Sequence, residues 1–247
     1  MSQGKPPKAS ADAWAARMRA DWEARASRSP HWFVDARADF DQPDAGAFGK
    51  RGESDLLRAL QVTGYSFRGD ESVLELGCGM GRMTGAIADR AGRVVGVDIS
   101  EGMLTHAIRA VGGRPNVALV RTDGISLAPL RDRSFNLVLC NAVYQHLPSL
   151  EVVESYTREI GRVLRPDGVA LFGLQSWTFS PYRWLRAAAA WTLNYRGFRR
   201  LGVYSRTFLG VRLNERRVRT LFSEAGMAVE GYWPLPDHRA WVRARRP

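Results

Sequence analysis

The chain has 247 residues, of which 45% are hydrophobic and 25% are charged, so its composition is that of a folded domain and excludes a low-complexity protein. No apolar run reaches the ~20 residues of a membrane-spanning helix, and residues 1–10 are polar, unlike a secretory signal, so we expect them to be disordered. The net charge of +11 is uneven: residues 176–247 hold fourteen arginines and four acidic residues, a balance of +10, so an acidic partner would meet that region.

Two cysteines, Cys78 and Cys140, form no CxxC pair and have no nearby histidine at metal-ligand spacing. Both lie beside the ends of predicted strands, which is typical of small thiols in a core or in the wall of a site. We therefore expect free thiols, no metal centre and a reducing, cytoplasmic environment.

The N-terminal part of the chain is predicted to be helical. Apolar residues recur every fourth position in residues 11–28, which predicts a helix there. These residues are Trp14, Met18 and Trp22. Residues 31–50 are aromatic and polar without a clear period. A group of leucines around Leu56 indicates a second helix, which ends near Gly64.

From residue 65 the chain alternates between short apolar runs and segments with helical periodicity. The predicted strands are 73–76, 94–97, 117–120, 135–139, 169–174, 227–233 and 239–245. The predicted helices are 83–90, a segment that Ser100 caps, 150–164 and a segment that Asn214 caps. This alternation predicts an α/β fold, in which helices cover both faces of a mostly parallel sheet.

A glycine-rich turn follows the first of these strands, in the run Glu75-Leu76-Gly77-Cys78-Gly79-Met80-Gly81. Such a turn lets the backbone approach a ligand more closely than side chains would allow. Asp98 ends the next strand, 21 residues after Gly77, where a carboxylate can accept hydrogen bonds from ribose hydroxyls. The glycine spacing is GxGxG, whereas nicotinamide-dinucleotide enzymes use GxGxxG, so we expect no binding of NAD.

The run E-L-G-C-G-M-G, followed by V-G-V-D, resembles the first two motifs of class I S-adenosylmethionine (SAM)-dependent methyltransferases. The run Phe135 to Val143 resembles the fourth motif of that family. Two further runs, Gln145 to Pro148 and Arg162 to Gly168, resemble the small-molecule subgroup known as type 11. The resemblance extends over residues 70–175 and the terminal helix and strands. It implies a Rossmann-like, seven-stranded, mostly parallel sheet with helices on both faces, plus N-terminal helices and a cap insertion after strand five.

The resemblance implies SAM as the cofactor and assigns residues to its methionine side. Glu75 would orient the glycine loop or bind the methionine amine. Gly77, Cys78 and Gly79 would pass under the methionine and the ribose, and Asn141 would lie near the sulfonium. The structural alternatives are a plain strand-to-helix turn for the glycines and a strand-end residue without a ligand for Asn141.

On the nucleoside side, the resemblance implies that Asp98 holds the ribose and that Ile99 packs on the adenine. Asp123, which Gly124 follows, would bond the adenine amine. The structural alternatives are a helix-capping acid for Asp98 and a turn-forming acid for Asp123.

His146 is the candidate catalytic base, because it lies just past strand four, near the carboxyl ends of the strands, where an open α/β sheet binds ligands. A hydroxyl acceptor benefits from such a base, whereas an amine acceptor needs only its neutral form. The alternative is that His146 caps a loop or bonds the backbone. Tyr144 is a weaker candidate, since an aromatic residue at a strand end is also typical of a pocket wall. The remaining histidines are weaker still: His31, His106 and His238.

The connection after strand five is long for a crossover, and in it aromatic residues alternate with arginines, without an acidic residue between 176 and 212. We expect a cap there that selects an acceptor bearing a phosphate, a carboxylate or a lipid tail, and a part of which contacts a membrane surface. The alternative is a solvated basic insertion. The expected parts of the chain are a disordered N-terminus (1–10), an N-terminal helical lid (11–64), the SAM-binding Rossmann-like core (65–175), the basic aromatic cap insertion (176–212) and the terminal helix with the last two strands (213–247).

Three functions follow from the sequence. The favoured one is methyl transfer to a small molecule, on a hydroxyl of a natural product, a sugar or a lipid-linked compound. A nucleic-acid (RNA) methyltransferase is disfavoured, because the fourth motif continues as Asn141-Ala142-Val143-Tyr144 and lacks the two prolines that place a flipped base. A non-catalytic SAM-binding protein is the third. The sequence does not indicate an oligomeric state.

Overall fold

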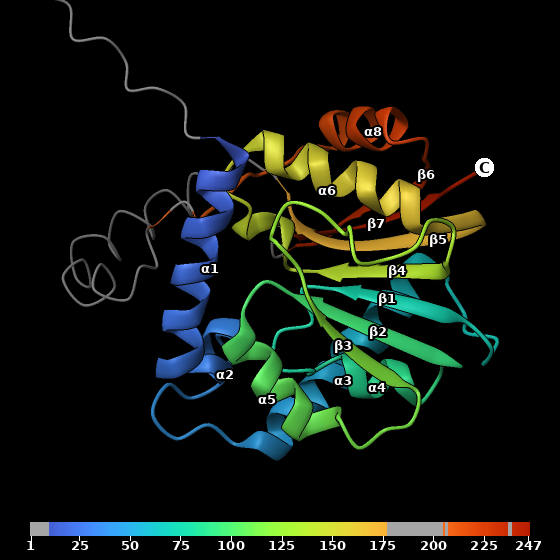
Figure 1. Ribbon diagram of the computed structural model, residues 1–247. Helices are drawn as coiled ribbons and strands as arrows, with labels where there is room; N and C mark the ends of the chain where they lie inside the picture. Colours follow the sequence, from blue (N-terminus) through green and yellow to red (C-terminus); the bar gives the residue numbers. More distant parts are fainter. Residues whose placement is uncertain (1–9, 177–204, 206, 237–238) are drawn as a thin grey trace, which may run out of the picture.

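Figure 1 shows the computed structural model, which describes residues 10–176, 205, 207–236 and 239–247. Three helices come first: α1 (Ala11–Arg28), α2 (Pro30–Val34) and α3 (Ala45–Thr63). The Ser10 hydroxyl caps α1 and the Asp44 carboxylate caps α3, and Gly64 ends α3 in the left-handed conformation with a φ of 62°. The helix predicted over 11–28 is confirmed, whereas α2 and the first turns of α3 were not predicted, because their residues show no apolar period.

Seven strands form one sheet in the order β3-β2-β1-β4-β5-β7-β6. The strands are β1 (Ser72–Leu76), β2 (Arg93–Asp98), β3 (Val117–Arg121), β4 (Phe135–Asn141), β5 (Leu164–Gln175), β6 (Ala228–Pro234) and β7 (Arg239–Arg245). The first five run parallel, and β7 runs antiparallel to both β5 and β6. The predicted seven-stranded, mostly parallel sheet is therefore confirmed. β5 begins earlier than predicted, because Leu164 already pairs with Phe135 across a bulge.

Helices cover both faces of this sheet. They are α4 (Thr84–Ala88), α5 (Glu101–Val111), α6 (Leu150–Val163) and α8 (Glu215–Glu224), with a 3₁₀ turn, η1 (Tyr144–His146), between β4 and α6. Side chains of Ser100 and Asn214 cap α5 and α8, as predicted. Helix α4 is shorter than predicted, because the chain is still in the glycine turn, with Gly81 at a φ of 78°, shortly before it.

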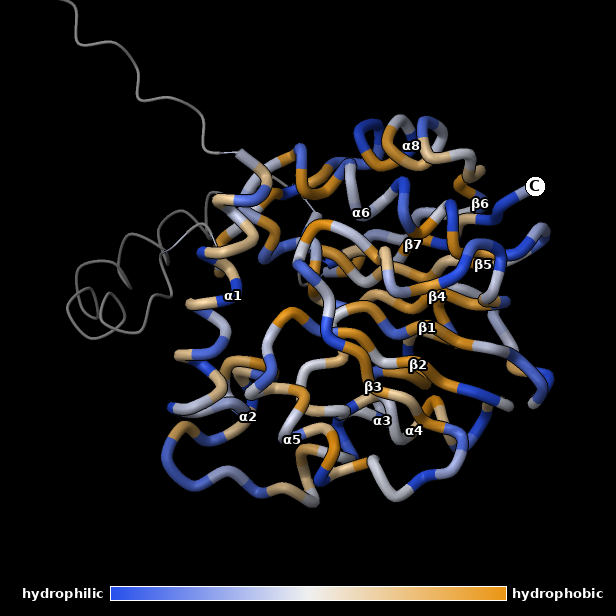
Figure 2. The backbone as a smooth tube through the Cα atoms, in the orientation of Figure 1, coloured by the Kyte–Doolittle hydropathy of each residue, from blue (hydrophilic) through white to orange (hydrophobic). Residues whose placement is uncertain are grey.

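Alternating strand residues divide the core into two layers. Leu74 and Leu76 of β1 pack with α6 and α8, whereas Val73 packs with α3 and α4 on the opposite face. The central strands β1, β2 and β4 accordingly appear largely in the hydrophobic colour in Figure 2. A sheet buried on both faces is held rigidly, and its strand ends form a fixed platform for a site.

Helix α1 crosses the edge of the sheet at which the parallel strands end (Figure 1). It is held there by polar contacts at its two sides. The Glu23 carboxylate accepts hydrogen bonds from the backbone N–H groups of Glu101 (2.6 Å) and Gly102 (2.9 Å) at the start of α5. The Arg19 guanidinium donates to the carbonyl oxygen of Asp123 at 3.3 Å. The N-terminal helix therefore closes over the carboxyl ends of the strands.

The residues at the two ends of the predicted cap lie side by side, because Ser176 and Leu213 form an isolated parallel bridge. Residues 177–204 and 206, which hold most of that predicted cap, lie outside the described residues, as do residues 1–9 of the predicted disordered N-terminus. Both predictions stay predictions. Among the described residues, no helix is long and apolar enough to cross a membrane.

Candidate active site

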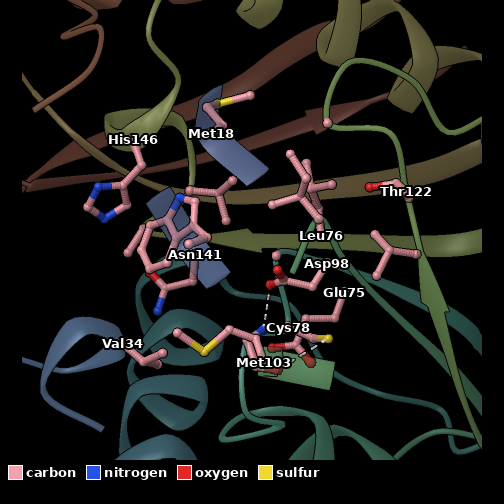
Figure 3. A pocket seen from close by; sticks show the side chains of 18 of the residues that line it. Met18, Val34, Glu75, Leu76, Cys78, Asp98, Met103, Thr122, Asn141 and His146 are labelled. Carbon is pink, nitrogen blue, oxygen red and sulfur yellow. Dashed lines mark hydrogen bonds between the residues drawn. The ribbon is translucent and has the colours of Figure 1, made fainter. Parts of the chain in front are cut away.

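A pocket opens at the carboxyl ends of β1, β2 and β4, beneath α1 (Figure 3). Its volume is about 940 Å³, counting the part that is open to solvent. The structure brings most of the predicted site residues together in its lining. These residues are Glu75, Gly77, Cys78, Gly79, Asp98, Ile99, Gly124, Asn141 and His146. In Figure 3, His146, Asn141 and Val34 lie on one side of the pocket and Thr122 lies on the other, with Asp98 between them.

The glycine loop forms the floor of the pocket. Gly77 has a φ of 68° and Gly79 a φ of 55°, in a region that side-chain-bearing residues rarely adopt. A Cβ on Gly77 would lie 2.4 Å from a methyl group of Val143. The N–H groups of Gly77 and Cys78 donate to the carbonyl oxygen of Val97, at 2.8 and 3.0 Å, so the loop is tied to the end of β2. Both positions therefore need glycine.

Asp98 joins the loop to the start of α5. One carboxylate oxygen accepts from the N–H of Gly79 and the other from the N–H of Ser100, each at 2.9 Å. Burial raises the pKa of Asp98, which the backbone hydrogen bonds oppose. The side chain thus combines the structural role of an acid before a helix with a position in the pocket lining.

Glu75 is the deeper of the two acids and is 5% exposed. Its carboxylate accepts a hydrogen bond from the Thr84 hydroxyl at 2.5 Å. Burial raises the pKa of Glu75 to about 7, although the Thr84 bond and the charge of Arg82 favour the ionised form. A cation bound beside it would stabilise the carboxylate.

Asn141 ends β4 and faces the same pocket. Its side-chain amide donates to the sulfur of Met83 at 3.3 Å. The next residue, Ala142, has a φ of 60°, which is rare for a residue with a side chain. This turn ends the strand and starts η1, which brings His146 to the pocket.

The imidazole of His146 is held on two sides. Its Nδ1 lies 2.6 Å from the carbonyl oxygen of Phe208, and its ring packs against the rings of Trp22 (5.3 Å between centroids) and Phe208 (4.9 Å). Because a carbonyl oxygen only accepts, Nδ1 carries the proton and Nε2 keeps its lone pair. Burial lowers the pKa of His146 to about 4, so the ring is neutral at physiological pH.

Arg82 also lines the pocket and is a site residue that was not predicted from the sequence. Its side chain is 9% exposed and one of its terminal nitrogens donates to Asp55 of α3 at 2.6 Å. Its Nε is buried without a hydrogen-bond partner among the described residues. A buried guanidinium nitrogen without an acceptor is costly, and it suits an anionic group of a ligand. Its place directly after the glycine loop was the signal available in the sequence.

The contact between α3 and Arg82 leads to a prediction for Gly52. An added Cβ there would lie 2.1 Å from the carbonyl oxygen of Arg82, which is backbone and cannot turn aside. We expect Gly52→Ala to lower the free energy of unfolding by about 1–3 kcal/mol, since overpacking forces the helix and the loop apart. Denaturant unfolding followed by circular dichroism measures this.

Gly49 provides the matched control, because it lies on the same helix and a Cβ added to it would have no atom within 4 Å. Gly49→Ala should leave stability unchanged or raise it by about 0.5–1 kcal/mol, through the higher helix propensity of alanine. Equal effects of the two substitutions would contradict the described packing of α3 on the glycine loop.

Two predicted site residues do not face the pocket in the manner expected. Tyr144 is 1% exposed and absent from the pocket lining, and its hydroxyl is 2.8 Å from that of Thr157 in the core, so its predicted catalytic role finds no support in this geometry and stays a prediction. The Asp123 carboxylate accepts from Ser126 and from the N–H of Ile125, which closes a turn, and it is absent from the lining that its neighbours Thr122 and Gly124 form. The adenine contact of Asp123 finds no support here and stays a prediction.

The cysteines and the remaining histidines are the other residues that the sequence brought forward. Cys78 and Cys140 are free and buried, and Cys78 lies in the pocket wall, as expected for core or site-wall thiols. Among the described residues, no group of three or more His, Cys, Asp or Glu side chains could hold a metal ion. His31 and His106 are absent from the pocket lining, and His238 lies outside the described residues.

The strand order, with a pocket above the carboxyl ends of the strands, defines a Rossmann-like α/β protein. Residues 74–172 match the model of a family described as "Methyltransferase domain". They therefore form a methyltransferase domain of the class I SAM-dependent type, whose cofactor is SAM.

Two curated relatives are also named as methyltransferases. A protein of Mycolicibacterium smegmatis named "Probable S-adenosylmethionine-dependent methyltransferase" is 38% identical over 45% of this chain and 41% of its own length. A ubiquinone biosynthesis O-methyltransferase of Neisseria meningitidis is 28% identical over 61% of this chain and 63% of its own length. The chain thus spans less than two thirds of the length of these curated relatives. A SAM-dependent methyltransferase from Aquifex aeolicus has a similar fold, with a TM-score of 0.56, 15% identity and coverage of 83% of this chain and 100% of that one.

The chemistry of the pocket residues fits SAM, which carries an ammonium and a sulfonium, a carboxylate, a ribose and a flat base. Two acids, Glu75 and Asp98, line the pocket and could accept hydrogen bonds from cationic and hydroxyl groups. The unpartnered Nε of Arg82 matches a carboxylate. The apolar side chains of Ile99 and Leu76 can pack against a base.

Proposed function

We propose that this chain transfers the methyl group of SAM to a hydroxyl group of a small acceptor with an apolar body. The observation that carries the proposal is the neutral imidazole of His146 at the pocket, with Nδ1 bonded to a backbone carbonyl and Nε2 left able to take a proton. The name of the Neisseria relative, an O-methyltransferase, supports the choice of oxygen.

In this proposal the pocket holds SAM in a defined orientation. The Glu75 carboxylate attracts the ammonium, and the Nε of Arg82 binds the carboxylate. Asp98 accepts from the ribose hydroxyls while it keeps the loop in place, and Ile99 packs on the adenine. Asn141 lies toward the sulfonium. SAM supplies an electrophilic methyl group on a sulfur that leaves as a neutral thioether.

The residues of the chain then supply position and proton transfer. The glycine loop and α1 fix the distance between donor and acceptor and exclude water. His146 removes the acceptor's hydroxyl proton at Nε2 and holds it until release to solvent. Its low pKa keeps it available as a base throughout the physiological range, although it makes the base a weak one.

The character of the acceptor is inferred from the apolar side chains that line the pocket with His146. Trp22 and Phe33 contribute aromatic surface, and Leu147 and Val34 contribute aliphatic surface. Such a wall favours an aromatic or otherwise flat apolar acceptor. The predicted selection of a phosphate, carboxylate or lipid tail by residues 176–212 is kept as a proposal, together with the contact of that segment with a membrane.

A transfer assay with methyl-labelled SAM and a panel of acceptors tests the function. The panel contains phenols and catechols, the matching anilines, hydroxylated lipids and RNA. We expect labelled product from hydroxyl acceptors and little from the anilines. Label that enters only the anilines or only RNA would contradict the proposal.

The buried acid Glu75 makes SAM affinity depend on pH. Because its pKa is about 7 in the ligand-free protein, half of the molecules carry a protonated Glu75 at pH 7. These molecules must lose the proton before the carboxylate can attract the ammonium. We expect the Kd for SAM to rise by up to about tenfold per pH unit below pH 7 and to level off above pH 8. Calorimetric titrations between pH 5.5 and 8.5 measure this.

The variant Glu75→Gln is the control, because it is neutral at every pH. Since the folded-state pKa is raised above the ordinary value of 4.5, ionisation of Glu75 costs stability as pH rises through 7. Glu75→Gln should therefore bind SAM weakly without this pH dependence and, without ligand, melt at a higher temperature than wild type at pH 8. An unchanged pH dependence in the variant would refute the role of Glu75.

A further inference from the structure

Arg25 of α1 is a buried arginine beside the candidate active site. It is 3% exposed, and its guanidinium lies against the rings of Trp22 (4.7 Å), Phe208 (5.2 Å) and Phe33 (5.8 Å). Burial lowers the pKa of Arg25 to about 10, and the nearby Asp21 opposes this. Burial of a charge is costly, and an apolar side chain of similar volume would pack as well, so the guanidinium itself needs an explanation.

The hydrogen bonds of Arg25 join α1 to the segment that follows residue 204. Its terminal nitrogens donate to the carbonyl and the hydroxyl oxygens of Thr207, both at 3.3 Å, and to the hydroxyl of Ser205 at 3.2 Å. The Thr207 hydroxyl in turn donates to the Asp21 carboxylate at 2.5 Å. One turn of α1 therefore fixes Thr207 from both sides.

The next residue of that segment carries the acceptor for His146. The carbonyl oxygen of Phe208 receives the Nδ1 proton of His146 at 2.6 Å. Further along, Gly210 donates to the carbonyl oxygen of Gln145 (2.6 Å) and Val211 to that of Leu147 (2.9 Å). Residues 207–211 thus run beside the turn that bears the imidazole, and Arg25 holds the end of this segment nearest to the ring.

Aromatic packing links the same residues a second time. Trp22 and Phe208 contact the imidazole of His146, and both also contact the guanidinium of Arg25. The imidazole therefore lies between two rings whose positions depend on one buried cation. Movement of Arg25 would therefore shift both the carbonyl oxygen that accepts from Nδ1 and the two aromatic rings that flank the imidazole.

We propose that Arg25 is a positioning residue that holds the Thr207–Phe208 backbone and its flanking rings, and thereby fixes His146 as the Nδ1-protonated tautomer. The expected effect of Arg25 on methyl transfer rests on the proposed function. Its effect on the imidazole is independent of that function. The guanidinium is needed because a planar group with several donors can bond a carbonyl and two hydroxyls while it stacks on aromatic rings.

Nitrogen NMR of the ¹⁵N-histidine-labelled protein tests the proposal without an activity assay, because ring shifts report tautomer and titration. The chain has four histidines, and His146→Asn assigns the signal. In wild type we expect the Nδ1–H tautomer, with titration well below the ordinary pKa of 6.5. A wild-type Nε2–H tautomer would overturn the proposal, even if no Arg25 variant folds.

Arg25→Met removes the donors and keeps an apolar side chain, and Arg28→Met is the matched control on the exposed side of the same helix. We expect Arg25→Met to mix the tautomers, raise the pKa of His146 and lower kcat at least about tenfold, since small misplacements of a catalytic group cost up to 10²-fold. The Kd for SAM should stay within about threefold of the wild-type value, because Arg25 does not line the pocket. Arg28→Met should change none of these.

Arg25→Lys separates charge from geometry, because lysine keeps the charge but not the planar fork. Under the proposal it does not restore the wild-type tautomer. Full restoration by lysine, or a wild-type tautomer and kcat in Arg25→Met, would overturn the proposal. A changed tautomer with an unchanged kcat would support the positioning role and contradict the assignment of His146 as the base.

Discussion

Replacement of His146 by alanine is expected to lower kcat for a hydroxyl acceptor by about 10²–10⁴-fold, the usual contribution of a general base. His146→Asn should have a similar effect, because its amide can still donate to the carbonyl of Phe208 but has no basic nitrogen in place of Nε2. The Kd for SAM should be nearly unchanged in both. Steady-state kinetics and calorimetric titrations measure the two quantities, and the comparison separates the loss of a base from the loss of a structural bond.

The pH profile provides the second part of this prediction. Because the pKa of His146 is about 4, kcat should not depend on its titration between pH 5.5 and 8 and should fall only as the pH approaches 4. The folded-state pKa lies below the ordinary value of 6.5, so stability should also decrease as the pH falls from 6.5 toward 4. An alanine variant within threefold of wild type would leave His146 a structural residue, and a rate that titrates near pH 6.5 would contradict the lowered pKa of the base.

Asp98→Ala is expected to weaken SAM binding by about 30- to 150-fold, which corresponds to roughly 2–3 kcal/mol for a lost pair of charge-assisted hydrogen bonds. The same change removes the acceptors of the Gly79 and Ser100 N–H groups, so the glycine loop loses a support as well as a ligand contact. Calorimetric titration with SAM measures the loss. Thermal unfolding without SAM shows how much of it is structural.

The comparison variant is Asp123→Ala, at the acid that follows β3. Its carboxylate closes a turn and is absent from the pocket lining, so this variant separates the two roles of the acid. A change in SAM affinity of less than about threefold would identify Asp123 as a turn-forming acid, and a larger loss would support the predicted adenine contact. Wild-type affinity in Asp98→Ala would show that the cofactor is not held at this pocket in the manner proposed.

The cofactor side of the site could be predicted because its residues are adjacent to strand ends in the sequence. Parallel strands end at one edge of the sheet, so Glu75, Asp98 and Asn141 necessarily converge there. The glycines carry a backbone requirement that is local, since Gly77 and Gly79 both have positive φ. The positions of strands and helices could also be predicted from apolar periodicity. Each face of the sheet packs against its own layer of helices, so the buried positions recur along each element.

The remaining site residues depend on geometry that the sequence does not encode locally. Tyr144 and His146 are two residues apart, and the turn that starts at Ala142 directs the tyrosine into the core and the histidine toward the pocket. Trp22 reaches His146 because α1 folds back over the sheet, across more than a hundred residues of sequence. The role of Arg25 depends on contacts between the two ends of the chain, which periodicity cannot reveal.

The most direct test of the account is an equilibrium titration of the wild-type protein with SAM, and with NAD in parallel. We expect one SAM to bind per chain with a Kd in the micromolar range, which is a binding free energy of about −8 kcal/mol. We expect no heat from NAD, because the GxGxG spacing of the loop lacks the third glycine of the GxGxxG dinucleotide motif. Binding of NAD, or no binding of SAM to the folded protein, would contradict the account.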